Sequence, residues 1–293
     1  MRARRSFGEM LFDIGNVGFL LLLMFSALYP FLYVALASVS DPAEMGKHQG
    51  LLLSPIGFHL DAYKAVLNNK MILTGFRNTL FYVLIGTTLN VVFTAMLAYA
   101  LSRKDLFLKN AIMYYVVFTM FFGGGLIPTY LMVKQLGLLN TGAAVILPGL
   151  ISAMNMIIMR TYFQSLPDSL EESAKIDGAN EFVILFKIVI PLSMPIIAVM
   201  LLYYGVGHWN SWFNASIYLT KPKLFPLQLV LRDILINSKT EDMMVSLGTK
   251  NGQDMSEMIK YAAIMVATIP VLLAYPFLQK YFVKGVMIGA IKG

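Results

Sequence analysis

The sequence contains no cysteine, and only 13% of its residues are charged. Without cysteine the chain can form no disulfide, zinc–thiolate site or thiol nucleophile. Soluble domains carry about 25% charged residues, whereas 58% of this chain is hydrophobic. So apolar a chain cannot cover its surface with polar groups in water. The composition therefore predicts a membrane protein.

Metal and nucleic-acid sites are not expected. His48, His59 and His208 lie far apart and lack the spacing of metal ligands. The net charge of +7 comes from basic residues spread over polar segments, without aromatic residues interleaved on one face. This pattern does not favour nucleic-acid binding. An excess of Lys and Arg is instead usual on the cytoplasmic loops of membrane proteins.

Six mainly apolar runs have roughly the 20 residues that a helix needs to cross a bilayer. They cover residues 14–38, 78–101, 111–133, 142–159, 188–207 and 261–278. We therefore predict an all-α fold, with residues 1–293 forming a single transmembrane domain of six helices. Arg2, Arg4 and Arg5 precede the first run as in a signal peptide. That run is too long for one and lacks a nearby cleavage motif, so we expect an uncleaved span.

The six runs contain no evident source of energy for transport. None carries Asp, Glu, Lys, Arg or His well inside it. This argues against a proton- or sodium-coupled carrier, although carbonyl and hydroxyl groups alone can hold Na⁺. The chain also lacks a Walker A sequence for ATP. Active transport would need a partner that supplies energy, and a stand-alone carrier or channel is the alternative.

Basic residues predict the orientation of the chain. With the N-terminus in the cytoplasm, four inner segments carry three Lys or Arg residues each, 12 of the 23 in the chain, in the shorter total length of loop. Both termini are therefore predicted to be cytoplasmic, and loops 39–77 and 212–260 external. Within the second loop, helical spacing predicts a short amphipathic helix from Leu227, Val230, Leu231, Ile234 and Leu235.

The segment 165–187, cytoplasmic in this topology, has the pattern of two short helices. Ser169 and Glu172 fit a capping box at the start of the first helix. Gly178 fits its end or a sharp turn. A second amphipathic piece follows, with Phe182, Leu185 and Phe186 on its apolar side. An interfacial membrane anchor is the simpler interpretation of such a segment.

The residues Glu172-Ser-Ala-Lys-Ile-Asp-Gly178, followed by Ile190-Pro191-Leu192, resemble the EAA loop of permeases in type I ABC importers. That pattern reads Glu-Ala-Ala, three variable residues, then Gly, and Ser173 here replaces one Ala. In that family the loop forms a coupling helix that sits in a cleft of the ATPase subunit. The resemblance implies that the following residues couple to the ATPase: Ser169, Glu171, Glu172, Ser173, Ala174, Asp177 and Gly178.

Other stretches narrow the resemblance. Residues 280–293 resemble the tail of the maltose-system permease, which reaches the ATPase dimer interface and implies a contact at Lys292 and Gly293. Residues 208–214 and 123–130 are similar to permeases for complex and acidic oligosaccharides, such as rhamnogalacturonan and alginate fragments. An importer for peptides or amino acids is the alternative.

The resemblance implies a bacterial inner-membrane assembly rather than an enzyme. The implied partners are a second, homologous permease chain, a homodimeric ATPase and an external solute-binding protein. ATP and Mg²⁺ would bind to the ATPase, and this chain would hold no cofactor. Its loop 212–260 would reach the binding protein with a tip near Lys239, Lys250 and Asn251. A surface loop without such a contact is the alternative.

Amide and aromatic side chains are candidates for the substrate path, because amides bond sugar hydroxyls and aromatic rings stack on sugar faces. The candidates are Asn90, Asn155, Trp209, Asn210 and Trp212. An aromatic belt at the membrane interface is the alternative for the tryptophans. The third run is interrupted by Gly123, Gly124, Gly125 and Pro128. These residues, like Asn90 and Asn155 in the neighbouring runs, fit either close helix packing or a hinge or translocation path.

Overall fold

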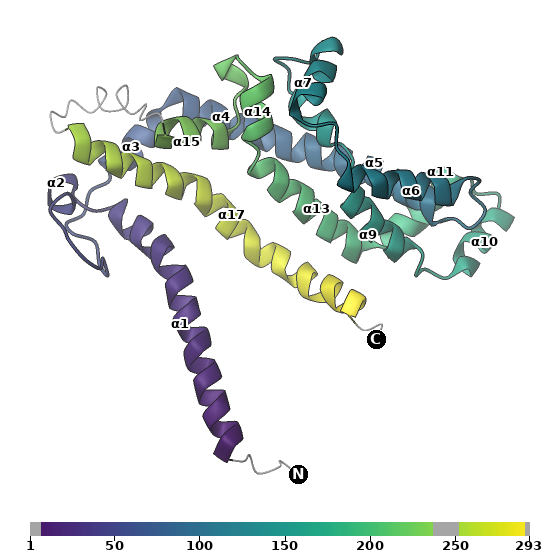
Figure 1. Cartoon of the computed structure of the whole chain (residues 1–293), viewed down its shortest axis with the longest axis horizontal. Helices are drawn as coiled ribbons and strands as arrows, with labels where there is room; N and C mark the ends of the chain where they lie inside the picture. The colour runs from purple at the N-terminus through teal and green to yellow at the C-terminus, as the bar shows by residue number, and fades with distance from the viewer. Residues whose placement is uncertain (1–6, 237–251, 291–293) are drawn as a thin grey trace. The chain divides into compact units, whose positions relative to one another are not determined.

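A computed structural model describes residues 7–236 and 252–290, and every regular element in those ranges is helical (Figure 1). The predicted all-α fold is therefore confirmed. The chain divides into two compact units. One joins the chain up to Asn69 with Asp233–Ile269, and the other joins Lys70–Arg232 with the chain from Pro270 on.

The first unit contains the N-terminal helix and two short helices that follow it. Its elements are α1 (Phe7–Ala37), α2 (Pro42–Met45) and α3 (Asp61–Asn68), together with the first part of α17 (Gly252–Ala290). Within α1, Ala37 is the one buried residue among those described. An apolar helix that buries so little against its own chain is suited to contact with lipid or another subunit.

The second unit holds most of the chain between the second and fifth predicted spans. Its helices before the turn at Gly178 are α4 (Lys70–Phe81), η1 (Tyr82–Gly86), α5 (Thr87–Ser102), α6 (Lys109–Phe121), α7 (Leu126–Gln135), α8 (Ala143–Ile146), η2 (Leu147–Gly149), α9 (Ala153–Phe163) and α10 (Asp168–Ile176). After that turn come α11 (Glu181–Ile184), η3 (Leu185–Val189), α12 (Ile190–Leu192), α13 (Met194–Trp209), α14 (Phe213–Tyr218), η4 (Pro222–Leu224) and α15 (Leu227–Ile236).

Among the described residues, three helices are long and apolar enough to cross a membrane, and there are up to six candidate spans if each of three bent helix pairs forms one span. Three are single helices: Phe7–Ala37, Lys70–Ser102 and Met255–Leu273. The other three are bent pairs: Lys109–Phe121 with Leu126–Gln135 at 114°, Ala143–Gly149 with Ala153–Phe163 at 54°, and Glu181–Leu192 with Met194–Trp209 at 88°. The bend in the first pair follows the glycine run, where Gly125 takes a φ of +83° that glycine adopts at little cost. The predicted interruption of the third span is therefore confirmed.

The predicted amphipathic helix near residue 230 is also confirmed. It is α15, and its side chains at Leu227, Val230, Leu231 and Ile234 are buried.

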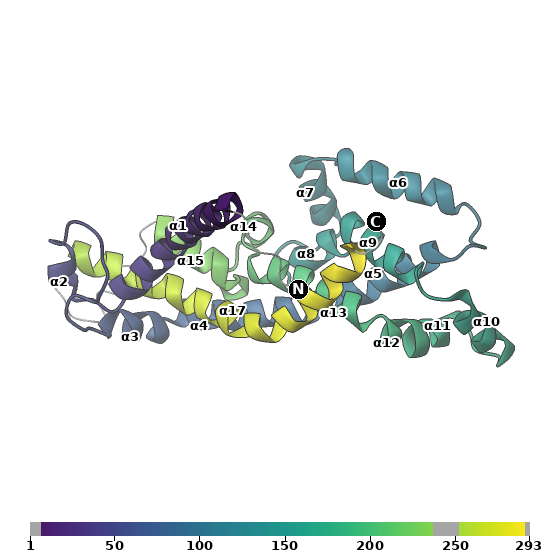
Figure 2. The same ribbon diagram turned by 90° about the horizontal axis from the view of Figure 1, so that it is seen from below.

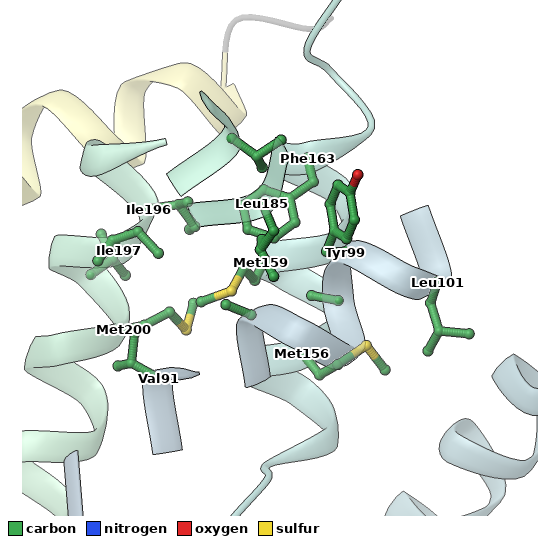
Figure 3. Packing of buried hydrophobic residues seen from close by; sticks show 14 of the residues in the cluster. Val91, Tyr99, Leu101, Met156, Met159, Phe163, Leu185, Ile196, Ile197 and Met200 are labelled. Atoms are coloured by element: carbon green, nitrogen blue, oxygen red, sulfur yellow. The ribbon is translucent and has the colours of Figure 1, made fainter. Parts of the chain in front are cut away.

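The core of the second unit lies between α5, α9 and α13 (Figure 3). Met156, Met159 and Met200 are fully buried there, and Figure 3 shows Met159 and Met200 reaching toward each other. Ala95 and Ala98 on α5 are also fully buried. Small residues let transmembrane helices approach closely, and flexible methionines fill the remaining gaps. This packing fixes the ends of α5, α9 and α13 from which the candidate site is built.

Candidate coupling site

The site is centred on α10, the short helix between the fourth and fifth spans. Figure 2 shows α10, α11 and α12 in succession at one end of the second unit. The N-cap residue of α10 is Pro167, and no side chain among the described residues caps this end. The predicted capping box of Ser169 and Glu172 is therefore wrong, because the N-cap lies two residues earlier, at Pro167, and the helix begins at Asp168. Asp168 and Glu171 lie in its first turn, where carboxylates favour the positive end of the helix dipole.

The C-terminal end of α10 is a Schellman turn. The N–H of Gly178 donates to the carbonyl of Lys175 at 3.0 Å, and the N–H of Ala179 donates to that of Ala174 at 2.9 Å. The turn needs a left-handed residue, and Gly178 has a φ of +83°. The predicted helix end at Gly178 is confirmed. A Cβ at this position would meet no atom within 4 Å, so the glycine is required by backbone conformation rather than by space.

The second short helix starts at Asn180, whose Oδ1 accepts a hydrogen bond from the N–H of Val183 at 2.9 Å. The chain then passes through the π-helical turn η3 and bends by 88° into α13. The three residues predicted to share one apolar side do not share one environment. Leu185 is buried in the core, whereas Phe182 and Phe186 are 62% and 43% exposed. A π-helical turn has more residues per turn than an α-helix, so it breaks the spacing on which that prediction rests.

One apolar side chain anchors α10 to the helical core. Ala174 is buried, and it belongs to the same cluster as Tyr99, Phe163 and Ile184. No other described residue of α10 is buried. The helix therefore touches its own chain along a narrow inner face.

Ion pairs fix the same inner face. Arg103, one residue beyond α5, forms an ion pair with Glu171, and the two side chains are only 17% and 12% exposed. The guanidinium also lies 4.5 Å from the centroid of the Tyr99 ring. The ammonium of Lys175 contacts Glu171 Oε1 at 3.1 Å and Glu181 Oε1 at 2.9 Å. Tyr99 donates to Glu181 Oε2 at 2.5 Å. We call these five residues the inner-face network; they join α5, α10 and α11.

A separate ion pair links Lys104 and Asp168 at 2.5 Å, and both side chains are largely exposed. The hydrogen bond from Lys104 lowers the pKa of Asp168, and the same bond raises the pKa of Lys104. Because the folded-state pKa of Asp168 is lowered, its contribution to stability is present at neutral pH and is lost as the pH falls through that pKa. Exposed pairs contribute little, so we expect a weak pH effect confined to acid.

The outer face of α10 is exposed. Ser169, Glu172, Ser173 and Asp177 are all exposed, and Ile176 is 86% exposed. The two neighbouring glutamates therefore have different positions: Glu171 points into the inner-face network and Glu172 points outward. The Ile176 side chain is therefore open to contact with a partner.

Sequence reasoning did not identify Tyr99, Arg103 and Glu181 as part of this site. Arg103 and Lys104 enter the sequence argument only as cytoplasmic charges that set the orientation. One signal was available: the predicted topology places this basic pair on the same side of the membrane as the acidic residues of 168–181. Which base meets which acid depends on the packing of α10 against α5, which spacing alone does not give.

The candidate substrate-path residue Asn90 has a structural role. It is fully buried, and its Nδ2 donates to the carbonyls of Gly149 and Leu150 at 2.9 and 2.7 Å. Its Oδ1 lies 2.6 Å from His208 Nε2. Gly149 and Leu150 form the break in the fourth span. Asn90 therefore fastens that break to α5 and to the end of α13.

Replacing Asn90 with leucine should destabilise the protein. The carbonyls of Gly149 and Leu150 and the His208 ring would each lose a partly buried hydrogen bond, and a hydrogen bond typically contributes about 0.5–1.5 kcal/mol. We expect a lower Tm of the purified protein in detergent. Thr88→Ala is the matched control, because exposed Thr88 bonds only to the carbonyl of Leu84 in its own helix. Equal Tm values for both variants would contradict the role given to Asn90.

The other candidate path residues have separate surroundings. Asn155 lies in the first turn of α9, and its N–H is 3.4 Å from Ser152 Oγ. Trp209 meets Phe76 edge to face at 6.0 Å between centroids. Trp212 lies 4.7 Å from the guanidinium of Arg232, and Asn210, just after α13, is exposed. The predicted contact residues Lys239, Lys250, Asn251, Lys292 and Gly293 lie outside the described residues.

Comparisons with known proteins all identify membrane transport proteins as relatives of this chain. Residues 91–288 match the family model described as "Binding-protein-dependent transport system inner membrane component". The polygalacturonan/rhamnogalacturonan transport system permease protein of Bacillus subtilis (strain 168) is 44% identical over 293 residues, which cover 97% of this chain and 99% of that protein. An arabinooligosaccharides transport system permease protein of the same bacterium is 28% identical and covers 94% of each chain.

A solved structure has the same fold. It is a chain in the crystal structure of a bacterial ABC transporter involved in the import of the acidic polysaccharide alginate. The TM-score is 0.90 at 33% sequence identity, and the match covers 95% of this chain and 99% of that one.

Proposed function

Because the chain belongs to the family of binding-protein-dependent transport system inner membrane components, we propose that it is a permease subunit of an ATP-driven importer for acidic oligosaccharides. The observation that carries the proposal is α10: a helix fixed to the bundle on one face and exposed on the other. The acidic cargo is supported by two relatives. One is named for polygalacturonan and rhamnogalacturonan, and the other acts in alginate import.

The assembly that we propose contains three kinds of partner. A second permease chain completes the membrane part, two ATPase chains bind ATP and Mg²⁺ on the cytoplasmic side, and an external binding protein delivers the sugar. The family's dependence on a binding protein supports the last of these. The absence of a Walker A sequence in this chain supports a separate ATPase.

The proposed topology places both termini and α10 in the cytoplasm. Arg103, Lys104, Arg160 and Lys175 lie at or near this end of the second unit, and cytoplasmic enrichment in Lys and Arg supports the assignment. Loops 39–77 and 212–260 are then external. The second of them is the proposed contact with the binding protein, and its proposed tip lies outside the described residues.

The geometry suits transmission of a displacement. ATPase chains that close on each other would press on the exposed face of α10, at Ser169, Glu172, Ser173, Ile176 and Asp177. Ala174 and the inner-face network prevent α10 from sliding on its own support, so the displacement passes to α5 and through α11 to α13. Because α5, α9 and α13 share one packed core, these helices should move together. Such rocking alternates access to a site within the membrane.

Reconstitution tests the proposed function directly. The two permeases, the ATPase and the binding protein would be assembled in proteoliposomes, with uptake and ATP hydrolysis measured against a panel of ligands. We expect stimulation by oligogalacturonate or oligoalginate, and none by peptides or amino acids. Uptake without ATP would contradict the importer, and stimulation by peptides alone would contradict the cargo.

Replacing Glu172 with lysine should weaken docking of the ATPase without changing the stability of the permease. The side chain is exposed and lies outside the inner-face network, so we expect an unchanged Tm of the permease. Reversal of charge on the docking face should instead reduce copurification of the ATPase and abolish most ligand-stimulated ATP hydrolysis. Glu172→Gln removes the charge without reversing it and should have the smaller effect. Full coupling in Glu172→Lys would show that this face does not meet the ATPase.

A further inference from the structure

The second unit contains a pocket of about 490 Å³. It lies at one end of a long helical segment, and α10 lies at the other end. That segment is Lys70–Ser102; Arg103 and α10 lie at its C-terminal end, and the pocket lies beside its first turns. Small-molecule sites typically measure about 300–1,000 Å³. The lining residues are Thr74, Arg77, Asn78, Phe81, Tyr82, Gly142, Lys223 and Leu224.

One wall of the pocket, the turn η4, is held in place by hydrogen bonds to α4 and η1. Asn78 Nδ2 donates to the carbonyls of Lys223 and Phe225 at 2.9 and 3.0 Å. The hydroxyl of Tyr82 donates to the intervening carbonyl of Leu224 at 2.8 Å. Three successive carbonyls of this turn are thus bound by side chains of the opposite wall. The backbone that carries Lys223 is therefore fixed across from the helix that carries Arg77.

The pocket has a cationic and aromatic lining. None of its eight lining residues is acidic, whereas Arg77 and Lys223 are basic. Both are exposed, and neither forms an ion pair within the part of the chain that the structure describes. The ring of Phe81 is 52% exposed at the same pocket. Two uncompensated cations favour an anion, and an open aromatic ring offers an apolar surface beside it.

We propose that this pocket is an entry site for the carboxylates of the incoming oligosaccharide. Arg77 and Lys223 bind uronate carboxylates there, and Phe81 contacts a sugar ring. The inference rests on the proposed function, which supplies both the acidic cargo and the external position of this end. The predicted spans carry no Lys or Arg well inside them, so an acidic sugar needs its countercharge at the mouth of the path. The planar guanidinium of Arg77 suits a carboxylate, and the ammonium of Lys223 adds a point charge.

Direct binding to the membrane complex of permeases and ATPase tests this site. The two permeases and the ATPase would be placed in phosphatidylcholine nanodiscs without the binding protein, and the Kd for trigalacturonate would be measured. We expect Arg77→Gln/Lys223→Gln to weaken binding about tenfold or more, as the loss of charge-assisted hydrogen bonds implies. The fully methyl-esterified trisaccharide should bind weakly to wild type and variant alike. Wild-type binding should also weaken with added salt more steeply than binding to the variant.

Two further variants and one lipid serve as controls. Arg77→Lys/Lys223→Arg keeps both charges and should bind within a few-fold of wild type. Lys221→Gln removes an exposed cation from the same loop, outside the pocket lining, and should change nothing. Replacing part of the phosphatidylcholine with phosphatidylglycerol should leave the Kd unchanged. Loss of trigalacturonate binding in that lipid would assign the pocket to lipid headgroups and overturn the proposal.

The outcomes distinguish a failure of the entry-site proposal from a failure of the proposed function. Undetectable wild-type binding, or equal Kd values for wild type and Arg77→Gln/Lys223→Gln, would overturn the entry site. So would a variant that binds trigalacturonate normally but docks the liganded binding protein poorly, because the cations would then recognise a protein. Any of these results leaves the importer intact if wild-type proteoliposomes still take up trigalacturonate with ATP. Failure of that uptake is a failure of the proposed function instead.

Discussion

Gly178→Val is expected to abolish ligand-stimulated ATP hydrolysis by the assembled importer while leaving membrane insertion unchanged. Gly178 has a φ of +83°, a conformation in which a β-branched residue is strongly disfavoured and which costs ordinary L-residues about 1–2 kcal/mol. The last turn of α10 would rearrange to escape this strain, and the hydrogen bonds from Gly178 and Ala179 would break. Because α10 is short, loss of its last turn alters the face that docks on the ATPase. The measurement is ATP hydrolysis in proteoliposomes with saturating liganded binding protein.

Gly178→Asn is the matched control. A Cβ at this position meets no atom within 4 Å, so size alone is tolerated, and asparagine visits the left-handed region more readily than other side chains. We expect this variant to keep most of the stimulated activity. Equal activity of the valine and asparagine variants would show that the left-handed turn is not needed for coupling.

Arg103→Met should have the second large effect. The Arg103–Glu171 pair is mostly withdrawn from solvent, and removing Arg103 leaves the Glu171 carboxylate with the more exposed Lys175 as its remaining partner. Breaking buried pairs in this way costs about 3–5 kcal/mol, and we expect about 2 kcal/mol here because both side chains keep some contact with water. The Tm of the permease should fall. Transport per ATP hydrolysed should fall as well, because α10 would be loosened from α5.

The double variant Arg103→Met/Glu171→Leu tests whether the charge left on Glu171 causes the fall in Tm. Removing both charges is milder than removing one, so the double variant should recover part of the lost Tm. Lys104→Met breaks the exposed pair with Asp168 instead, and its Tm should equal that of wild type. A double variant less stable than Arg103→Met, or a fall in Tm for Lys104→Met, would contradict the division between a supporting pair and a surface pair.

Sequence patterns predicted the features that depend on composition and on local backbone. The six spans follow from apolar runs, the bend after residues 123–125 follows from three successive glycines, and the end of α10 follows from Gly178. Each of these needs only a short stretch of chain to be determined. The capping-box pattern places the N-cap of α10 at Ser169, two residues too late, because a serine followed three residues later by Glu172 fits that pattern, whereas the actual N-cap, Pro167, has no side chain that can accept a hydrogen bond.

Features that depend on packing between distant segments were not predicted. For Asn90 the sequence leaves a place in the substrate path and a role in helix packing both open, and it does not predict the hydrogen bonds that join the side chain to His208 and to the break at Gly149 and Leu150. Arg103 reads as one more cytoplasmic cation, yet it is withdrawn against Glu171. Both roles depend on contacts between helices that are far apart in sequence, and hydrophobic periodicity does not predict which helices are in contact.

A single cross-linking experiment tests the central claim that α10 is the cytoplasmic contact with the ATPase. The chain has no cysteine, so Ile176→Cys, at a position 86% exposed, can carry a benzophenone maleimide as its single label. Phe58→Cys, at a position 71% exposed in the proposed external loop, is the control. The account predicts light-dependent cross-linking of residue 176 to the ATPase, and labelling of residue 58 from outside without that cross-link. Labelling of residue 176 from outside, or its cross-linking to lipid alone, would contradict the account.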